Sequence, residues 1–409
     1  MLTDRRLIFL SAGLRASAVG LSGVILSLHL ASLGLTAWWI GLAISLGLAG
    51  CAVGTGLVAF LTDRLGRRKT LVLLALLMAV GGLGFVWATH TSVLLVSALI
   101  GMVNGMGRDR GAGVTVDQAI LPQTTDALNR TKVFAWYNLM VDGGHAVGAL
   151  LAGIPAFLRS HGGVAALDSY RWTWALYTGL CVASGLVALC LSRAVELRQA
   201  RVTTRLSAKS RRIVGRFAAL SGLDSLGGGF LTTALLSYWF FTRFGVDESF
   251  LGPLFFVVRV LNGLSHLGAS WLAKRIGLIN TMVFTHLPSS VLLMTVPIAP
   301  NLPVAVALFL IRESLVEMDV PTRQSYIVAM VHEDERTQAA GITNLTRSVA
   351  WAVAPLVAGS LMRTVSLSSP LLLGPSLKVA YDLLLYRAFR HLKPPEECPP
   401  PTSLVLRQD

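Results

Sequence analysis

Apolar stretches of about 20 residues recur along the whole chain and are separated by short polar segments. A helix of that length crosses a hydrocarbon core of ~30 Å, so each stretch predicts a membrane span. The pattern predicts twelve spans, near residues 7–33, 37–62, 69–89, 92–121, 132–157, 172–192, 214–242, 248–273, 278–299, 303–331, 337–362 and 367–390. The predicted fold class is therefore an all-α integral membrane protein.

Composition agrees with this fold class. Hydrophobic residues make up 54% of the chain and charged residues only 14%, whereas a soluble domain carries roughly 25% charged residues. The first span follows a charged start and contains Arg15 without a clear cleavage site, so we expect a retained helix rather than a signal peptide. The 4 cysteines show neither paired nor metal-type spacing, so we expect no metal and no cofactor.

Basic residues gather in alternate loops and predict the orientation of the chain. The polar stretch "SRAVELRQARVTTRLSAKSRRIVGR" holds eight Lys or Arg against one Glu. Because Lys and Arg favour the cytoplasmic side, this bias predicts that both termini are cytoplasmic, and we expect a multi-pass protein of the plasma (inner) membrane. The bias also accounts for the net charge of +14, so the predicted contact is with anionic lipid and not with nucleic acid.

Short matches at a near-constant spacing indicate an internal repeat. "FLTDRLG" (60–66) matches "WLAKRIG" (271–277), and Asp109 matches Asp319. Six-helix repeats are a recognised transporter design. We therefore predict an N-terminal six-helix bundle, a basic linker, a C-terminal six-helix bundle and a disordered Pro-rich tail, at residues 1–192, 193–213, 214–392 and 393–409.

The segment "AFLTDRLGRRKTL" (59–71) resembles a signature of the major facilitator superfamily, G-x-L-A-D-R-x-G-R-K-x-x-L. Ala59 and Thr62 depart from the signature. The matching residues are Leu61, Asp63, Arg64, Gly66, Arg67, Arg68 and Leu71. With twelve predicted spans, the resemblance covers nearly the whole chain. It implies two bundles that rock about a central site, with a cavity lined by the spans near 7–33, 92–121, 214–242 and 303–331.

The resemblance also implies a cytoplasmic gate formed by Asp63, Arg64, Gly66 and Arg67. An acid in this place can face the N-terminal end of a neighbouring helix, where the helix dipole favours negative charge. The resemblance nominates the helix that starts near Thr337. Asp63 would then hold the cytoplasmic side shut, while the arginines bind acids or lipid. The alternative is that the basic residues only set the topology.

Charged residues inside the predicted spans are a second source of candidates. Each costs ~2.5–3.5 kcal/mol on insertion scales and usually faces a cavity or a partner. Bases and acids are equal in number, as mutual pairing requires. They are Arg15, Arg108, Arg110, Arg259, Arg312, Arg323, Arg347 and Lys378, against Asp109, Asp117, Asp142, Asp224, Glu313, Glu317, Asp319 and Asp382. One interpretation is structural ion pairs, which we favour for Arg259, Lys378 and Asp382 on outer helices. Asp117 is expected on a solvated face.

The other interpretation is a solute and proton site near the middle of the membrane. Burial favours the protonated form of a carboxyl and a nearby arginine favours its charged form, so a change of partner can load and release a proton. The candidate binding residues are Arg15, Asp109, Asp142, Asp224, Glu313, Asp319, Arg323 and Arg347. We predict that the segment "NGMGRDRGAG" (104–113) stays within its span as a helix bent by glycines, and that Pro321 permits a kink beside Asp319.

Together these features predict a secondary active transporter that moves a small organic solute by alternating access, coupled to protons. Export is preferred over the alternative, which is import or facilitated diffusion of a polar or anionic metabolite. A non-transporting, receptor-like membrane protein is the hypothesis of a different class. The motifs H-E-x-x-H and G-x-S-x-G and Walker-type loops do not occur, so we do not expect an enzyme. The expected partners are the solute, protons and membrane lipids, and the chain is expected to act as a monomer.

Overall fold

The structure is a computed structural model that describes residues 2–109, 111–125, 129–196, 207–318, 323, 326 and 335–390. Within these residues the chain is helical and contains no β-strand. In the same part of the chain, 7 helical segments are long and apolar enough to cross a membrane. The predicted class, an all-helical membrane protein, is confirmed.

The described residues fall into an N-terminal half (2–196) and a C-terminal half (207–390). The helices of the first half are α1 (Leu2–Ser32), α2 (Ala37–Leu65), α3 (Arg67–Trp87), α4 (Thr91–Ile100), α5 (Ala112–Ile120), α6 (Arg130–Leu151), α7 (Ile154–Gly162) and α8 (Ala166–Leu189). Those of the second half are α9 (Ala208–Gly229), α10 (Thr233–Phe244), α11 (Glu248–Ile276), α12 (Leu278–Thr295), α13 (Leu302–Val316), α15 (Arg336–Thr364) and α16 (Ser369–Phe389).

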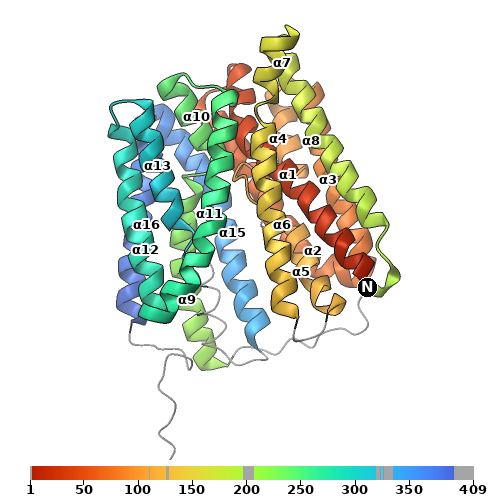
Figure 1. The fold of residues 1–409 in the computed structure, drawn as a ribbon, viewed down its shortest axis with the longest axis vertical. Coiled ribbons are helices and arrows are strands. Elements are labelled where there is room, and N and C mark those ends of the chain that lie inside the picture. The colour runs from red at the N-terminus through yellow and green to blue at the C-terminus, as the bar shows by residue number, and fades with distance from the viewer. Residues whose placement is uncertain are drawn as a thin grey trace, which may run out of the picture.

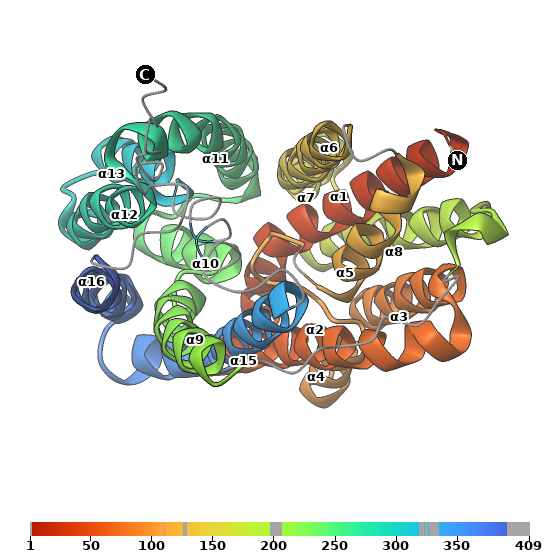
Figure 2. The same cartoon turned by 90° about the horizontal axis from the view of Figure 1, so that it is seen from below.

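The two halves lie side by side and run from one end of the molecule to the other (Figure 1). Figure 2 shows α1 to α8 gathered on one side and α9 to α16 on the other. The halves meet where α2 packs on α15 and α6 packs on α11. Glycines permit the close approach, since a Cβ on Gly41 would lie 2.4 Å from the carbonyl oxygen of Pro355 and one on Gly252 would lie 2.9 Å from that of Ala149.

One predicted span is not a continuous helix. Helix α4 ends at Ile100 and α5 begins at Ala112, so the prediction of a bent helix through residues 104–113 is wrong. Glycine accounts for part of the break, because Gly107 has a φ of 64°, a left-handed conformation that costs glycine nothing. The segment nevertheless stays inside the molecule, since residues 101–105 are all buried.

Irregular backbone at membrane depth is tolerated only where protein groups satisfy it. Asn104, which belongs to the non-helical stretch between α4 and α5, supplies hydrogen bonds to its backbone. Its Nδ2 donates to the carbonyl of Arg108 at 2.7 Å, and its Oδ1 accepts from the amide of Met106 at 2.8 Å. The side chain of Asn104 thus replaces the helical hydrogen bonds that the break removes.

A second predicted span, near 214–242, breaks in the same way. Helix α9 ends at Gly229 and α10 begins at Thr233, so this span is also two helices. The amide of Ala234 donates to the carbonyl of Gly105 at 3.0 Å, and the Thr233 hydroxyl donates to the carbonyl of Met106 at 2.8 Å. The two broken elements, one from each half, therefore satisfy each other's backbone where they meet.

Helices α1 and α6 pack at backbone distance. A Cβ on Gly148 would lie 2.0 Å from the carbonyl oxygen of Ser17, and one on Gly20 would lie 2.3 Å from that of His145. We predict that Gly148→Val forces the helices apart and lowers stability by about 1–3 kcal/mol or more, as overpacking does. Gly143→Val on the same helix meets open space and is the matched control. Equal melting temperatures of the two variants in thermal unfolding would contradict this packing.

Candidate functional site

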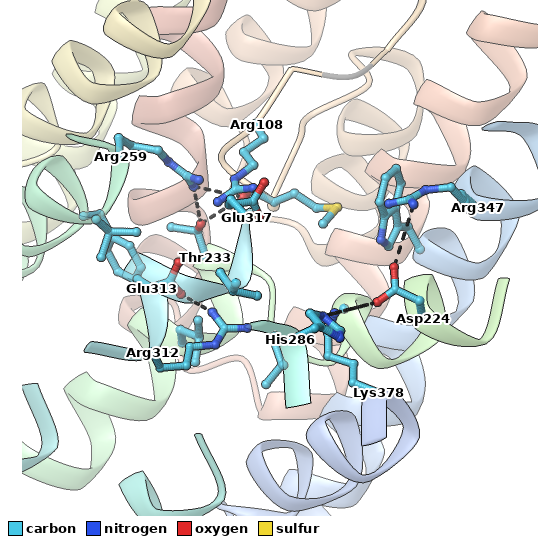
Figure 3. Close-up of a pocket in the computed structure, with 18 of the residues that line it drawn as sticks. Arg108, Asp224, Thr233, Arg259, His286, Arg312, Glu313, Glu317, Arg347 and Lys378 are labelled. Carbon is cyan, nitrogen blue, oxygen red and sulfur yellow. Dashed lines mark hydrogen bonds and ion pairs between the residues drawn. The ribbon is translucent and has the colours of Figure 1, made fainter. Parts of the chain in front are cut away.

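A polar cavity of about 100 Å³ lies mainly within the C-terminal half (Figure 3). It lies beside the non-helical stretch between α4 and α5, which we call the irregular segment. Its walls come from α9 to α13, α15 and α16, and the N-terminal half contributes Met106 and Arg108. Among the described residues that line it, six are basic and three are acidic, namely Arg108, Arg259, Arg312, Arg323, Arg347 and Lys378 against Asp224, Glu313 and Glu317. Charges at membrane depth usually mark a solute or ion pathway, so this cavity is the candidate binding site.

Asp224 on α9 is the centre of one charged cluster on the cavity wall (Figure 3). The Nζ of Lys378 on α16 lies 2.8 Å from its Oδ1, and the Nη1 of Arg323 lies 3.1 Å from its Oδ2. Arg347 on α15 approaches the same Oδ2 at 3.8 Å, and its guanidinium lies over the ring of Trp351. A single buried carboxylate therefore holds three cations from separate parts of the chain.

His286 on α12 links this cluster to a second buried acid. Its Nδ1 lies 3.0 Å from both carboxylate oxygens of Asp382, and its Nε2 lies 3.2 Å from the Nζ of Lys378. An ammonium group can only donate, so Nε2 is the acceptor and the ring proton sits on Nδ1, toward Asp382. Hydrogen bonds thus run without interruption from Asp382 through His286 and Lys378 to Asp224.

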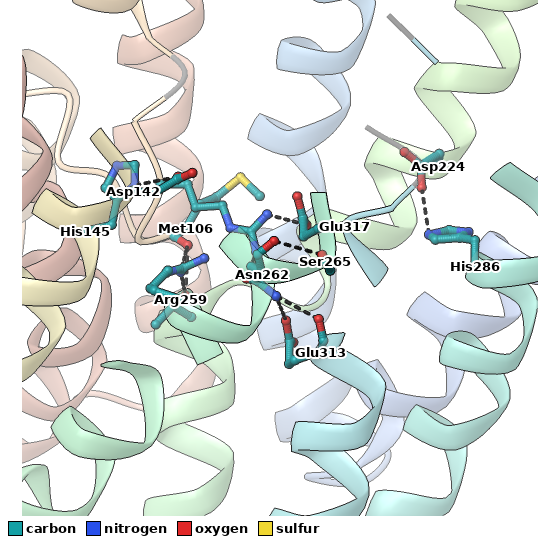
Figure 4. A network of polar contacts seen from close by, with 12 residues as sticks. Met106, Asp142, His145, Asp224, Arg259, Asn262, Ser265, His286, Glu313 and Glu317 are labelled. Carbon is teal, nitrogen blue, oxygen red and sulfur yellow. Dashed lines mark hydrogen bonds and ion pairs between the residues drawn. The ribbon is translucent and has the colours of Figure 1, made fainter. Parts of the chain in front are cut away.

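Arg108 connects the irregular segment with the wall of the cavity that α11 and α13 form. Its guanidinium pairs with Glu317 and donates to the Oδ1 of Asn262 on α11. Asn262 donates in turn to the Oε2 of Glu313 at 3.0 Å, as Figure 4 shows. Glu313 also pairs with Arg312, its neighbour on α13. The N-terminal half therefore reaches the cavity through a network of charges that it shares with α11 and α13.

Arg259 and Lys378 do not lie in outer ion pairs, as the sequence led us to expect, but line the cavity. The Nη2 of Arg259 donates to the Thr233 hydroxyl at 2.9 Å. Asp382 lies directly behind the cavity wall, in contact with His286. The reason is helical spacing, because Lys378 and Asp382 stand at i and i+4 and so share one face of α16, which turns inward.

A second buried cluster lies in the N-terminal half and is centred on Arg15 of α1. Its Nε lies 2.5 Å from the Oδ2 of Asp109, and its Nη2 lies 2.6 Å from the Oδ2 of Asp117 on α5. The hydroxyl of Tyr137 donates to the same oxygen of Asp117 at 2.9 Å. Gly113 makes room, since a Cβ there would lie 2.7 Å from the Cζ of Arg15. Here one cation lies between two acids, whereas around Asp224 one acid lies among three cations.

Asp117 is a correction to the sequence analysis. It was expected on a solvated face, yet its exposed fraction is 0%. The physical reason is the break before α5, because a helix that restarts at Ala112 does not continue the register of α4 and turns Asp117 toward Arg15. Among the described residues, the Oδ1 of Asp117 has no hydrogen-bond partner. This buried carboxylate therefore has hydrogen bonds to one of its two oxygens and, within the described part of the chain, none to the other.

Two more candidates from the sequence lie beside the Arg15 cluster. The amide of Asp109 donates to the Nε2 of His145 on α6 at 2.7 Å. The Nδ1 of the same ring lies 3.8 Å from Asp142, a half-buried residue one turn earlier (Figure 4). Asp142 thus contacts the cluster through His145. Asp319 and Arg110 lie outside the described residues, as does the side chain of Asp63.

The predicted gate segment is held by an acid that the sequence analysis did not single out. Glu196 lies at the N-terminal end of α3, where the amide of Arg67 donates to its Oε2 at 2.6 Å. Gly66, with a φ of 86°, brings the chain close enough for this contact. The guanidinium of Arg67 is buried and donates to the carbonyl of Val195 at 3.1 Å, so it does not face lipid, whereas Arg64 is exposed. A carboxylate here is favoured by the helix dipole.

At the opposite end of the molecule, one buried acid joins the two halves. Glu248 at the start of α11 pairs with the Nη2 of Arg159 on α7 at 2.5 Å. The hydroxyl of Tyr170 on α8 donates to its other oxygen. Glu248 is only 2% exposed, whereas the side chain of Arg159 is 26% exposed, so the acid is shielded and its cation reaches the surface. This contact fastens the halves together at the end away from the N terminus.

Sequence reasoning missed His286, Asn262, Glu196 and Glu248. His286 and Asn262 are polar residues within apolar spans, and that isolation was the signal that could have found them. The count of charged residues in the spans omitted both, because histidine was treated as neutral and asparagine carries no charge. Glu196 lies in the predicted linker and Glu248 is the first residue of the predicted span 248–273, and sequence alone gives an acid in either place no particular partner.

Two broken helices that meet between helical halves, beside a cavity lined with charges, are typical of membrane transporters. The sequence profile of the Major Facilitator Superfamily matches residues 8–401. The chain therefore belongs to the major facilitator superfamily, and it is a secondary transporter rather than an enzyme.

Related proteins and solved structures agree. The chain is 26% identical over 416 residues to the uncharacterized membrane protein YJR124C of Saccharomyces cerevisiae, covering 93% of each chain. A crystal structure of the D-xylose-proton symporter superposes with a TM-score of 0.76 at 14% identity, covering 94% of this chain and 97% of that one. A mutant of the nucleoside transporter NupG superposes with a TM-score of 0.71 at 14% identity, covering 95% of this chain and 98% of that one. At these identities the solved structures show the shared fold.

Proposed function

We propose that the chain moves a small polar organic solute across the membrane by alternating access, coupled to protons. The observation that carries the proposal is the cavity of about 100 Å³, whose described lining includes six basic and three acidic side chains. Such a lining suits a polar solute, because an apolar compound would displace the water around these charges and offer no hydrogen bond in return. It supports a polar or anionic metabolite as the solute.

Proton coupling has two candidate carriers, one in each half. In the N-terminal half Arg15 lies between Asp109 and Asp117, and in the C-terminal half Asp224 lies among Lys378 and two arginines. A carboxylate that loses its cation in a buried place favours the protonated form. The likeness of fold to the D-xylose-proton symporter adds support, since that protein is named for such coupling.

The proposal includes the architecture that alternating access requires. We place twelve spans in two six-helix bundles, residues 1–192 and 214–392, joined by the linker at 193–213, with both termini and the tail at 393–409 in the cytoplasm. The bundles rock about the cavity. Glu248 fastens the outer end, and the segment with Asp63, Arg64, Gly66 and Arg67 forms the inner gate. The chain acts as a monomer in the plasma (inner) membrane, in contact with its lipids.

Flux into proteoliposomes tests this function. With an imposed pH gradient, we expect the reconstituted chain to accumulate at least one solute from a panel of small carboxylates, sugars, nucleosides and amino acids. An uncoupler should abolish the accumulation, because it dissipates the proton gradient. Accumulation that survives the uncoupler would contradict proton coupling. Absence of flux for every solute would contradict transport and favour the receptor-like alternative.

A further inference from the structure

His286 is a buried histidine on the cavity wall, and its two ring nitrogens have different kinds of partner (Figure 3). Its Nδ1 lies 3.0 Å from both oxygens of Asp382, so the proton on this nitrogen is held by an acid. Its Nε2 lies 3.2 Å from the Nζ of Lys378 and accepts a hydrogen bond from that ammonium group. In this arrangement the ring is neutral, and Nε2 is the place where a second proton would bind.

Lys378 and a second proton compete for this Nε2. The nitrogen has a single lone pair, so it cannot accept a hydrogen bond from Lys378 once it carries a proton of its own. The ammonium group, 3.2 Å away, also repels the positive charge of an imidazolium. When Lys378 turns away, both obstacles are removed, and the carboxylate of Asp382 at 3.0 Å stabilises the imidazolium. His286 then holds a proton in the place that Lys378 has left.

We propose that His286 carries the transported proton of the C-terminal half, and that Lys378 leaves its Nε2 when Lys378 binds the solute. This inference rests on the proposed function and names His286, in place of Asp224, as the carrier of this half. Both side chains line the cavity, so solute and water can reach them. In the chemical step a hydronium ion in the cavity gives its proton to Nε2. One N–H bond forms, one O–H bond breaks, and a water molecule remains.

Asp224 stays charged through this exchange, because other cations remain beside it. The Nη1 of Arg323 lies 3.1 Å from its Oδ2, and Arg347 approaches the same oxygen at 3.8 Å. Its Oδ1, from which Lys378 withdraws, lies 3.7 Å from the Nε2 of His286. A proton on that nitrogen therefore brings to Asp224 the positive charge that Lys378 takes away. A carboxylate beside such cations favours its charged form, so the proton stays on His286.

The titratable and charged groups around His286 come, within the described part of the chain, from α9 and α16. They are Asp224, Lys378, Tyr381 and Asp382, of which the Tyr381 ring packs edge-on against the imidazole. Helices α11 and α13 also pack on α12. Their charged residues on the cavity wall have other partners, since Arg312 pairs with Glu313 and Arg259 donates to Thr233. Among these groups it is Lys378 that occupies Nε2.

This competition couples the solute to the proton. A solute that accepts hydrogen bonds from Lys378 draws the ammonium group away from Nε2 and so promotes proton binding. By thermodynamic reciprocity, a proton on His286 releases Lys378 toward the cavity and strengthens solute binding by the same factor. When the solute leaves, Lys378 returns to Nε2 and the proton is released. Solute and proton therefore bind together and move in the same direction.

The protons of the ring test the competition without any solute. Nitrogen NMR of the purified full-length protein, labelled at histidine, reports which ring nitrogens carry protons, and the signal missing from His286→Gln identifies this ring. At about pH 6, just below the ordinary histidine pKa of ~6.5, we expect a proton on Nδ1 alone in the wild type and on both nitrogens in Lys378→Met. Methionine removes the donor, and the variant should fold because Arg323 still pairs with Asp224.

Arg363→Gln, which removes an exposed positive charge on α15, is the control for this measurement and should leave the ring as in the wild type. The same protonation in the wild type and in Lys378→Met would overturn the competition. A wild-type ring whose proton lies on Nε2 would also overturn it, because that nitrogen could not then accept from Lys378.

Flux separates a proton carrier from a structural residue. In His286→Gln the amide can still donate to Asp382 and accept from Lys378, but it does not take up a proton. We expect this variant to exchange solute across proteoliposomes without a gradient and to lose uncoupler-sensitive accumulation. His161→Gln, which changes an exposed histidine on α7, is the matched control and should accumulate solute as the wild type does. Accumulation by His286→Gln at the wild-type level would overturn the assignment, as would loss of exchange by the folded variant.

The two measurements distinguish failure of this inference from failure of the proposed function. If the wild type and His286→Gln both accumulate a solute with the proton gradient, the chain is a proton-coupled transporter and the assignment of its carrier fails. If the wild type moves no solute of any class, the proposed function fails. The NMR comparison, which needs no solute, then still decides whether Lys378 and a proton compete for His286.

Discussion

The Arg15→Gln variant is expected to melt well below the wild type and to transport nothing. Arg15 lies 2.5 Å from Asp109 and 2.6 Å from Asp117, and its loss leaves two buried carboxylates without their shared cation. Removing one partner of a buried ion pair costs about 3–5 kcal/mol, because an uncompensated charge stays behind. Thermal unfolding in detergent and gradient-driven flux in proteoliposomes measure the two effects.

Two further variants show whether the unbalanced carboxylates cause the loss of stability in Arg15→Gln. Arg15→Gln combined with Asp117→Asn should recover part of the melting temperature, since one of the two unbalanced charges is then removed. Arg171→Gln breaks an exposed pair with Asp168 on α8, and should cost at most about 1 kcal/mol. A wild-type melting temperature for Arg15→Gln would show that this cluster does not stabilise the N-terminal half.

The Lys378→Gln variant is expected to lose solute binding by about 100-fold or more while it still folds. Lys378 holds Asp224 at 2.8 Å and connects it with His286, so its removal takes away both a cation of the site and the link to Asp382. Loss of a charge-assisted contact to the solute would cost about 2.7 kcal/mol, which corresponds to 100-fold in affinity. Titration of the transported solute by calorimetry or thermal shift measures the loss.

A purely structural role for Lys378 predicts a different pattern. If Lys378 only balances Asp224, then Lys378→Gln combined with Asp224→Asn should restore both stability and binding. If it binds solute, the double variant should regain stability but not affinity. Arg363→Gln changes an exposed arginine near the end of α15 and is the control for a lost positive charge.

The helices could be predicted well from the sequence, because burial in lipid imposes a simple rule on length and hydrophobicity. The irregular segment could not. Its glycines were noticed, but hydropathy does not distinguish a bent helix from irregular backbone that is satisfied by Asn104 and by Thr233 of the other half. Those contacts join residues far apart in the chain. The same error placed Asp117 on a solvated face, because its direction depends on where α5 starts.

The partners of the charged candidate residues could not be predicted either, because they come from distant parts of the chain. That Arg15 and Asp224 face a cavity or a partner could be expected, because a charge inside a membrane span is costly otherwise. Which partners they take could not be expected, since Lys378 reaches Asp224 from a helix far along the chain, at a separation of 154 residues. Depth along a span can be counted from a sequence, but the face that a helix turns inward depends on tertiary packing. For that reason Lys378 and Arg259 were assigned to outer ion pairs.

The central claim is that the charged cavity around Asp224 is the solute site of a proton-coupled transporter. Gradient-driven flux of the wild type, Lys378→Gln and Arg363→Gln, reconstituted at equal density and measured side by side, tests it most directly. We predict uncoupler-sensitive accumulation for the wild type and for Arg363→Gln, and none for Lys378→Gln. Accumulation by Lys378→Gln at the wild-type rate would contradict the claim and place the solute elsewhere.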